Sequence, residues 1–173
     1  MAIYKLTDPK NTTLTIPLSG VSKDLDRQKI KDDLIETMKH YSGIGLSANQ
    51  CGILERVFVM YGDFQKREAI ACFNPKIVYS SVDTVIMDEG CLTYPGLWLK
   101  VKRPATIEVE YEDENGKEWK HKLDGLDARV YLHEMDHMDG TDFTKRVSKL
   151  RLDMAKKRRA KQQKKLLDIS KNT

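Results

Sequence analysis

Residues 126–138 read Leu-Asp-Ala-Arg-Val-Tyr-Leu-His-Glu-Met-Asp-His-Met, and this stretch decides how the chain is organised. Its apolar residues recur at helical spacing, which predicts a helix with one inward face. His133 and His137 lie on that face four residues apart, so both imidazoles project the same way and can bind one ion. Glu134 lies beside them, placed to take a proton from an activated water. The pattern predicts a metal-dependent hydrolase.

Length and composition indicate an ordinary globular protein. The chain has 173 residues, of which 40% are hydrophobic and 32% charged, and that length suits one domain. No apolar run approaches the roughly 20 residues that cross a bilayer. The first residues lack a basic region followed by an apolar core, so we expect a cytosolic protein of bacterial type. The odd number of cysteines (Cys51, Cys72, Cys91) predicts reduced thiols, one or more of them available to a metal.

The net charge of +4 is unevenly distributed. From Lys145 onward there are 12 Lys and Arg residues against two acids, whereas residues 1–144 carry 18 bases against 24 acids. The stretch 156–165 is almost wholly polar and has no aromatic residue that could stack on bases. One interpretation is a solvated helix; the other is attraction to phosphate groups without sequence readout. We expect residues 1–150 to form the catalytic domain, with residues 151–173 as its basic helical tail.

Hydrophobic periodicity predicts the remaining elements. Ser22 can cap a helix that runs to about Tyr41, and a further helix starts at about Val147. Asn115-Gly116 is a strong hairpin signal between two strands. The strand-like runs are residues 56–61, 70–80, 104–111 and 117–123. We therefore expect an α+β fold in which antiparallel strands pack around a central helix carrying the His-Glu-x-Asp-His motif, with an N-terminal helix and a basic C-terminal helix.

The motif does not by itself identify the class of hydrolase, because a third protein ligand is needed. No Glu follows Glu134, which weakens the thermolysin-like interpretation, and Phe143 stands where a metzincin would have its third His. The ligand should therefore come from the preceding part of the chain. Cys91 stands out because residues 88–96 form a loop punctuated by Gly and Pro, where backbone can approach a ligand closely. The other candidates are His40, His121, Cys51, Cys72 and scattered carboxylates.

Three motifs, taken in order, resemble those of the peptide deformylase family. They are residues 43–50 (GIGLSANQ), 89–93 (EGCLT) and 133–137 (HEMDH), with about forty residues between neighbours. The resemblance covers roughly residues 40–140, and the first 20 residues match poorly. The departures replace no group needed for catalysis. They are Ser47 for the more usual Ala, Thr93 for Ser and Met138 for Leu.

The resemblance implies an enzyme that removes the formyl group from N-formylmethionyl nascent peptides and releases formate. It also implies that Cys91, His133 and His137 hold one divalent ion, commonly Fe²⁺, although thiolate and imidazole ligands suit Zn²⁺ and Ni²⁺ as well. Glu134 would act as general base and then as general acid.

The same resemblance assigns the remaining site residues. Gln50 and the backbone N–H of Leu92 would form an oxyanion hole for the charge that develops on the formyl oxygen. The backbone of residues 44–46 would pair with the substrate as an added strand, and apolar side chains would hold the methionine. The substrate-binding residues are then Gly43, Ile44, Gly45, Leu46, Leu126 and Val130.

The sequence also leads us to expect particular environments for three polar residues in or near the motifs. Arg103 is expected to brace Glu89 through an ion pair. Arg129 is expected at the surface, packed along its stem. Asp136 could orient a ligand histidine, or it could simply be solvated.

Two alternatives remain open. A metallopeptidase of another class is weakened by the missing downstream ligand, and a ribosome- or RNA-binding protein with a structural metal would need a fourth protein ligand. For a deformylase we expect a monomer without membrane attachment. Docking of the basic tail on ribosomal RNA is our hypothesis, because such an enzyme must meet nascent chains as they leave the ribosome.

Overall fold

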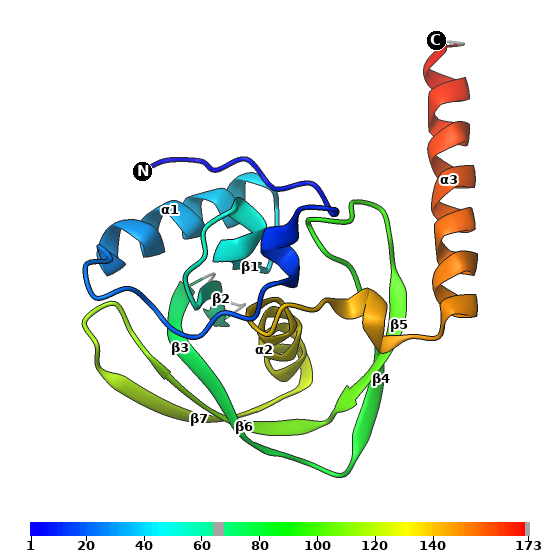
Figure 1. Cartoon of the computed structure of the whole chain (residues 1–173). Coiled ribbons are helices and arrows are strands. Elements are labelled where there is room, and N and C mark those ends of the chain that lie inside the picture. Colours follow the sequence, from blue (N-terminus) through cyan, green and yellow to red (C-terminus); the bar gives the residue numbers. More distant parts are fainter. Residues whose placement is uncertain (64–67, 172–173) are drawn as a thin grey trace.

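The computed structural model describes residues 1–63 and 68–171, and Figure 1 shows strands surrounding one central helix. The helices are α1 (Arg27–His40), α2 (Gly125–Met138) and α3 (Lys149–Lys171), with short 3-10 helices η1 (Thr12–Thr15), η2 (Ala48–Cys51) and η3 (Phe143–Arg146). The strands are β1 (Gly45–Ser47), β2 (Val57–Asp63), β3 (Glu68–Ser80), β4 (Thr84–Glu89), β5 (Leu99–Pro104), β6 (Thr106–Glu112) and β7 (Glu118–Asp124). Residues 172 and 173 of the predicted tail lie outside the described residues.

All strand pairs are antiparallel and form two sheets. The larger has the order β1-β2-β3-β6-β7, and the smaller is the β4-β5 hairpin. The α+β prediction is therefore confirmed. β1 lies at an edge of its sheet, and residues 90–98 join β4 to β5 as a loop that carries Cys91.

Helix α2 is buried on all sides. Every residue from 128 to 138 is buried, and α2 shares a core cluster with side chains of β2, β3 and β6. Tyr131 packs edge-to-face against Phe58, with ring centroids 5.0 Å apart. Because a helix buried all round has no solvated face, its polar side chains must find partners inside the protein.

Helix α1 covers the sheet near β1, β2 and β3, where Leu34 and Met38 are fully buried. The predicted start of this helix at Ser22 is wrong, because Asp26 caps it and accepts a hydrogen bond from Lys29 N at 2.9 Å. Ser22 instead donates to the carboxylate of Glu55 from its backbone N, at 2.7 Å, and from Oγ, at 2.5 Å.

The strand predictions are correct for β2, β3, β6 and β7, and they miss β1, β4 and all of β5 except its last residue. The predicted runs 56–61, 70–80 and 117–123 correspond to β2, β3 and β7. The run 104–111 is divided at Ala105, where the chain leaves β5 and enters β6. β1 has only three residues, and most of β4 is exposed, so neither shows the alternating apolar pattern by which a strand is recognised.

Helix α3 leaves the body of the protein and extends away from it (Figure 1). At its base, Leu152 and Ala155 pack in a cluster with Leu97 and Phe143. Residues 161–170 are all exposed. No helix in the described part of the chain is long and apolar enough to cross a membrane.

Candidate metal centre and active site

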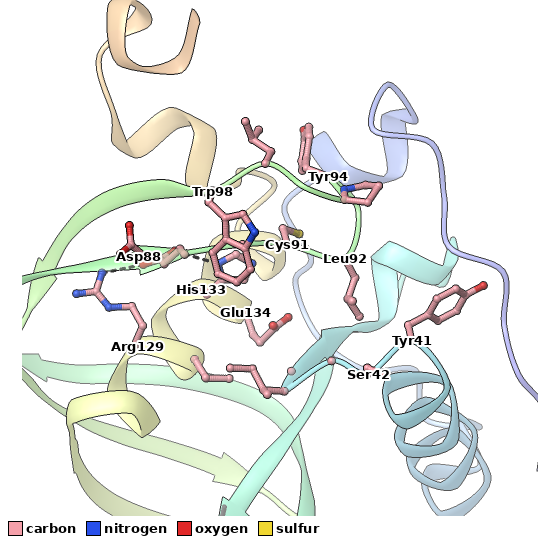
Figure 2. Close-up of a pocket in the computed structure, with 18 of the residues that line it drawn as sticks. Tyr41, Ser42, Asp88, Cys91, Leu92, Tyr94, Trp98, Arg129, His133 and Glu134 are labelled. Atoms are coloured by element: carbon pink, nitrogen blue, oxygen red, sulfur yellow. Dashed lines mark hydrogen bonds and ion pairs between the residues drawn. The ribbon is translucent and has the colours of Figure 1, made fainter. Parts of the chain in front are cut away.

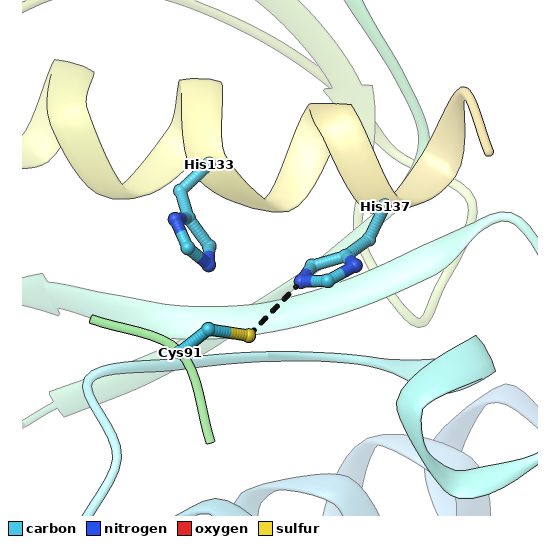
Figure 3. A group of neighbouring side chains, drawn as sticks. All are labelled: Cys91, His133 and His137. Atoms are coloured by element: carbon cyan, nitrogen blue, oxygen red, sulfur yellow. Dashed lines mark hydrogen bonds between the residues drawn. The ribbon is translucent and has the colours of Figure 1, made fainter. Parts of the chain in front are cut away.

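Figure 3 shows Cys91, His133 and His137 gathered around one point. Helix α2 presents both histidines on one face, and Cys91 reaches them from the loop after β4. One ligand atom from each residue lies within 4.8 Å of the others, and Cys91 Sγ is 3.4 Å from His137 Nε2. In residues 1–63 and 68–171, no other group of three or more His, Cys, Asp or Glu side chains is close enough to hold an ion.

The other upstream candidates for a third ligand lie elsewhere. His40 packs edge-to-face against Tyr41 at the end of α1, and His121 stacks with aromatic side chains of the β6-β7 hairpin. Cys51 and Cys72 pack in the hydrophobic core. Cys91 is therefore the candidate that the fold brings to the two histidines.

The three groups influence one another's charge. Burial would raise the pKa of the Cys91 thiol, but the adjacent His137 and His133 outweigh burial and lower that pKa to about 6. Burial would lower the pKa of both imidazoles, and the neighbouring thiolate raises the pKa of each instead. A thiolate with two imidazoles is a donor set that suits Fe²⁺, Zn²⁺ and Ni²⁺. These residues therefore fit a divalent ion, which on binding would displace the protons that the three groups hold.

The orientation of both rings also fits an ion. His133 Nδ1 lies 3.0 Å from Glu89 Oε2, which leaves Nε2 as the ligand atom. His137 Nε2 is the atom beside Cys91, while its Nδ1 is buried without a hydrogen-bond partner among the described residues. Both rings can therefore offer an unprotonated Nε2 while Nδ1 keeps its proton.

Glu89 is the buried anion that holds this arrangement. It accepts hydrogen bonds from Arg103 Nε at 2.6 Å and Nη2 at 2.9 Å, and from Arg129 Nη1 at 2.7 Å. The predicted Arg103–Glu89 pair is confirmed. Burial would raise the pKa of Glu89, but Arg103 and His133 outweigh it and hold that pKa well below its usual range. An ionised carboxylate on Nδ1 orients the His133 ring and increases its basicity as a ligand.

Arg129 is not at the surface, so that prediction is wrong. Its side chain is 5% exposed, and besides Glu89 it donates to the backbone carbonyls of Val85 at 2.7 Å and Val101 at 2.9 Å. The physical reason is the all-round burial of α2, which leaves a guanidinium on any face in need of internal acceptors.

Asp136 fits neither of the two expectations for it. The residue is buried, and its Oδ2 lies 2.9 Å from Arg103 Nη1 and 3.1 Å from Arg146 Nε. Asp136 therefore acts on His133 indirectly. It pairs with Arg103, Arg103 pairs with Glu89, and Glu89 contacts the His133 ring.

Cys91, His133 and His137 are called the ligand cluster below. Gln50, the third residue of η2, lies beside it. Its Nε2 is 3.4 Å from Cys91 Sγ and donates to Thr93 Oγ1 at 2.9 Å, while its Oε1 accepts from Ser47 N at 2.9 Å. These contacts on both ends hold the buried amide with its Nε2 beside Cys91 and Thr93. Leu92 follows Cys91 in the same loop.

A close approach of chain segments explains Gly43. A Cβ atom at position 43 would lie 2.7 Å from Leu92 Cδ1, a distance that real Cβ contacts do not show. A side chain at this position would therefore displace the end of the Leu92 side chain from the place it occupies beside the segment before β1.

Glu134 lines the cavity next to the ligand cluster (Figure 2). Ser47 Oγ donates a hydrogen bond to its Oε2. A Cβ at Gly45 would lie 2.5 Å from Glu134 Oε1 and 2.9 Å from Val130 Cγ1, so only glycine allows this approach of the carboxylate to β1. Sequence reasoning missed the contact of Ser47, and the only signal for it is the departure from Ala at that motif position.

The cavity has a volume of about 450 Å³. Ile44 and Leu126 are half-exposed at its edge, Val130 is buried, and Trp98 is 61% exposed on the wall formed by the loop after β4. The side chain of Leu46 is fully buried in the core beneath α1, so the part of Leu46 assigned to substrate binding is its backbone. The predicted substrate residues that line the cavity together are Gly43, Ile44, Gly45, Leu126 and Val130.

Comparison with known proteins supports the resemblance seen in the motifs. The family model described as Polypeptide deformylase matches residues 1–153. A peptide deformylase of Rhizobium meliloti (strain 1021) is 37% identical over 155 residues, which are 88% of each chain. The crystal structure of peptide deformylase from Thermotoga maritima has a TM-score of 0.80 and 34% identity, covering 86% of this chain and 99% of that one. The structure of peptide deformylase from Ehrlichia chaffeensis in complex with actinonin has a TM-score of 0.83 and 35% identity, covering 94% and 98%. The chain belongs to the peptide deformylase family.

Proposed function

We propose that this protein hydrolyses the N-terminal formyl group of formylmethionyl nascent peptides and releases formate. The observation that carries the proposal is a group of five side chains: three candidate ligands for an ion, a carboxylate and a primary amide. Four of them line one cavity, and the fifth, His137, lies against Cys91. The five residues are Cys91, His133, His137, Glu134 and Gln50. Because formylated nascent chains are made on ribosomes, we also propose that the protein works in the cytosol. We propose that it does so as a monomer.

A divalent ion held by Cys91, His133 and His137, Fe²⁺ in our proposal, supplies Lewis acidity and lowers the pKa of water when bound. Zn²⁺ and Ni²⁺ suit the same donors. The charged pair of Glu89 with Arg103 keeps the His133 ring in place for it. Three protein ligands leave an open position, which is typical of catalytic rather than structural sites.

Proton transfer falls to Glu134. Its carboxylate takes a proton from the attacking water as the new C–O bond to the formyl carbon forms. The same residue then delivers a proton to the amine nitrogen as the C–N bond breaks, so that formate and a free N-terminal amine leave. General acid–base catalysis of this kind typically contributes about 10²–10⁴-fold to the rate.

Charge stabilisation falls to Gln50 and Leu92. As water adds, negative charge develops on the formyl oxygen, and the Gln50 Nε2 and the Leu92 backbone N–H are the proposed donors to it. Gln50 is already held in place by its contact with Ser47 N, which limits the reorganisation needed at the moment of reaction. Removal of one such donor typically costs about 10²–10³-fold in kcat.

Substrate binding falls to the edge strand and the apolar wall. β1 pairs with β2 on one side only, so its outer edge can accept the peptide backbone as an added strand. Because Gly43 and Gly45 have no side chains, they leave room for the peptide backbone at this edge. Ile44, Leu126 and Val130 then form the apolar surface for the methionine side chain.

The basic tail has a separate proposed role. We propose that residues 151–173 are a helical tail on the catalytic domain of residues 1–150 and attract the phosphates of ribosomal RNA. Apart from its base, this helix is exposed, and residues 156–165 lack the aromatic side chains that would read bases. Its position near the cavity supports the proposal, because the stem of Arg159 lies beside Gly96 in the cavity wall.

The test is to load the protein anaerobically with Fe²⁺ or Ni²⁺ and to measure formate release from a formyl-methionyl tripeptide. Glu134→Gln is the control, because it removes the proton acceptor and keeps the size of the side chain. We expect formate from the parent protein and about 10²–10⁴-fold less from the variant. No formate, or an unimpaired variant, would contradict the proposal. Cleavage of the peptide bond instead would favour a metallopeptidase, and bound metal without turnover would favour a structural site.

A further inference from the structure

Ser47 contacts both of the side chains to which the proposed function gives a chemical role outside the metal. It is the last residue of β1 and is fully buried. Its hydroxyl donates to Glu134 Oε2, across 87 positions of sequence. Its backbone N–H donates to Gln50 Oε1 at 2.9 Å. One residue therefore touches the proton-transfer group with its side chain and the oxyanion amide with its main chain.

The hydroxyl distinguishes the two oxygens of Glu134. Oε2 accepts from Ser47, while Oε1 lies against Gly45, where an added Cβ would stand only 2.5 Å away. Both contacts come from β1, the strand that borders the cavity. A carboxylate that is engaged on one oxygen and confined at the other has a defined orientation, and Oε1 is left to exchange protons with the substrate.

The two contacts of Ser47 can be separated experimentally. Its backbone N–H is present whatever side chain stands at position 47, so the contact that holds the Gln50 side-chain oxygen does not depend on the hydroxyl. The contact with Glu134 does depend on it, and alanine is the more usual residue at this motif position. Replacing Ser47 by Ala removes the hydroxyl contact to Glu134 and the capping-box contact of that hydroxyl with the Gln50 backbone N–H, and it keeps the Ser47 N–H on Gln50 Oε1. The two losses are distinguished by repeating the replacement where Glu134 is out of reach, as described below.

We propose that Ser47 is a positioning residue for this reaction, whose hydroxyl holds Glu134 in the orientation needed for proton transfer. The proposal rests on the proposed function, because it assigns Ser47 a role through Glu134. A purely structural alternative is that the hydroxyl merely satisfies its own hydrogen-bonding need at the nearest acceptor. The alternative predicts lower stability on removal and no specific loss of turnover.

The first measurement is kcat and KM for formate release by the parent protein and by Ser47→Ala, both loaded with Ni²⁺. Because the whole base contributes about 10²–10⁴-fold, loss of its orientation alone is expected to lower kcat about tenfold, with KM unchanged. Thr37→Val is the matched control. It removes an equally buried hydroxyl, which donates to Asp33 O at 2.7 Å within α1 and accepts from Tyr4 N at 3.0 Å, and its kcat should equal that of the parent.

The second measurement repeats Ser47→Ala in a Glu134→Asp background, where the carboxylate is withdrawn by one methylene. A positioning role predicts that Ser47→Ala has no further effect on kcat there, because its partner is no longer in reach. An equal loss in both backgrounds, or an unchanged kcat of Ser47→Ala in the active parent, would overturn the positioning role alone. Absence of formate release from the parent would instead overturn the proposed function and, with it, the role of Ser47.

Discussion

Helices α2 and α3 are both rich in polar residues, and they lie in opposite environments. From residue 128 to residue 138, α2 is buried throughout. Most of α3 is exposed, and it extends away from the body (Figure 1). In α2 the buried charged side chains have partners inside the protein, as in the Arg129–Glu89 pair and the Asp136–Arg103 pair. In α3 the charges face water.

This difference in burial predicts how strongly the replacement of one charged residue affects the protein. A buried charge depends on its partner, because a lone ion in the interior costs several kcal/mol, so changes near α2 should be large and local. Charges in water are screened and act together over about 8–10 Å at physiological salt, so changes in α3 should be small, additive and sensitive to salt. Four experiments test this contrast, from the largest expected effect to the smallest.

Loss of a ligand should have the largest effect. We expect Cys91→Ala to lower bound metal to background and to reduce formate release by about 10³-fold or more, because the Lewis acid is lost with its thiolate ligand. Metal content by elemental analysis and formate release check this. Cys51→Ala is the matched control, since that thiol lies in the core away from the ligand cluster and should leave both quantities at the parent level. Equal metal content in the two variants would argue against Cys91 as a ligand.

Removal of the buried anion should be next. Glu89→Gln leaves Arg103 and Arg129 without their shared carboxylate, which should lower the free energy of unfolding by about 3–5 kcal/mol and metal affinity by about 10–100-fold. Urea denaturation and a metal-competition titration measure the two effects. Asp88→Asn is the neighbouring control, because Asp88 pairs with Lys100 at the surface and should cost at most about 1 kcal/mol. Similar losses in the two variants would remove the contrast between buried and exposed charges.

A buried carboxylate away from the metal separates burial from metal binding. Lys29, the Ala2 backbone N–H and Tyr4 outweigh the burial of Asp33 and lower its pKa from 3.8 to about 2. Because the folded pKa lies below the unfolded one, this group stabilises the fold above pH 3.8, and its contribution is lost as the pH falls through about 2. Acid titration of unfolding should therefore show a stability difference between the parent and Asp33→Asn that shrinks over this window. A difference independent of pH would contradict the ionised pairing.

The exposed charges of α3 should have the smallest effect on turnover. Lys156→Gln, Lys157→Gln and Arg158→Gln combined should leave hydrolysis of a short formylated peptide unchanged, because all three side chains are exposed on the helix. Ribosome binding should weaken, and its dependence on the logarithm of salt concentration should fall by about one unit for each phosphate that the helix no longer neutralises. Gln162→Ala with Gln163→Ala is the matched control on the same helix. An unchanged salt dependence in the charge variant would end the proposal for the tail.

Some of the site follows from short-range pattern. The spacing of His133 and His137 requires only a helix, and α2 supplies it. The Asn115-Gly116 turn requires only two neighbouring strands, and β6 and β7 are joined there. The Gly- and Pro-punctuated segment around Cys91 is recognisable as a loop for close approach. In each case the chemistry of a few adjacent residues limits what the backbone can do.

Other features could not be predicted from local pattern because they join distant segments. The error over Arg129 arose because helical periodicity predicts one buried face, whereas the sheets and the loops cover α2 on every side. The motif allows Asp136 to be either the partner of a ligand histidine or an acid at the surface. In the structure it is neither, because Arg103 on β5 lies within reach and pairs with it. β1 is too short to show a pattern and is defined by its pairing with β2.

The amino-acid sequence by itself determined the α+β class, the two histidines on one helical face and the asymmetry of charge between body and tail. These depend on spacing and composition, which local sterics and solvation convert directly into structure. Only the tertiary structure decided which upstream residue meets the histidines, how Glu89 is shared between two arginines, and that Ser47 holds Glu134. Those contacts join residues between 14 and 87 positions apart, and their energies depend on burial and direction, which exist only once the elements have packed.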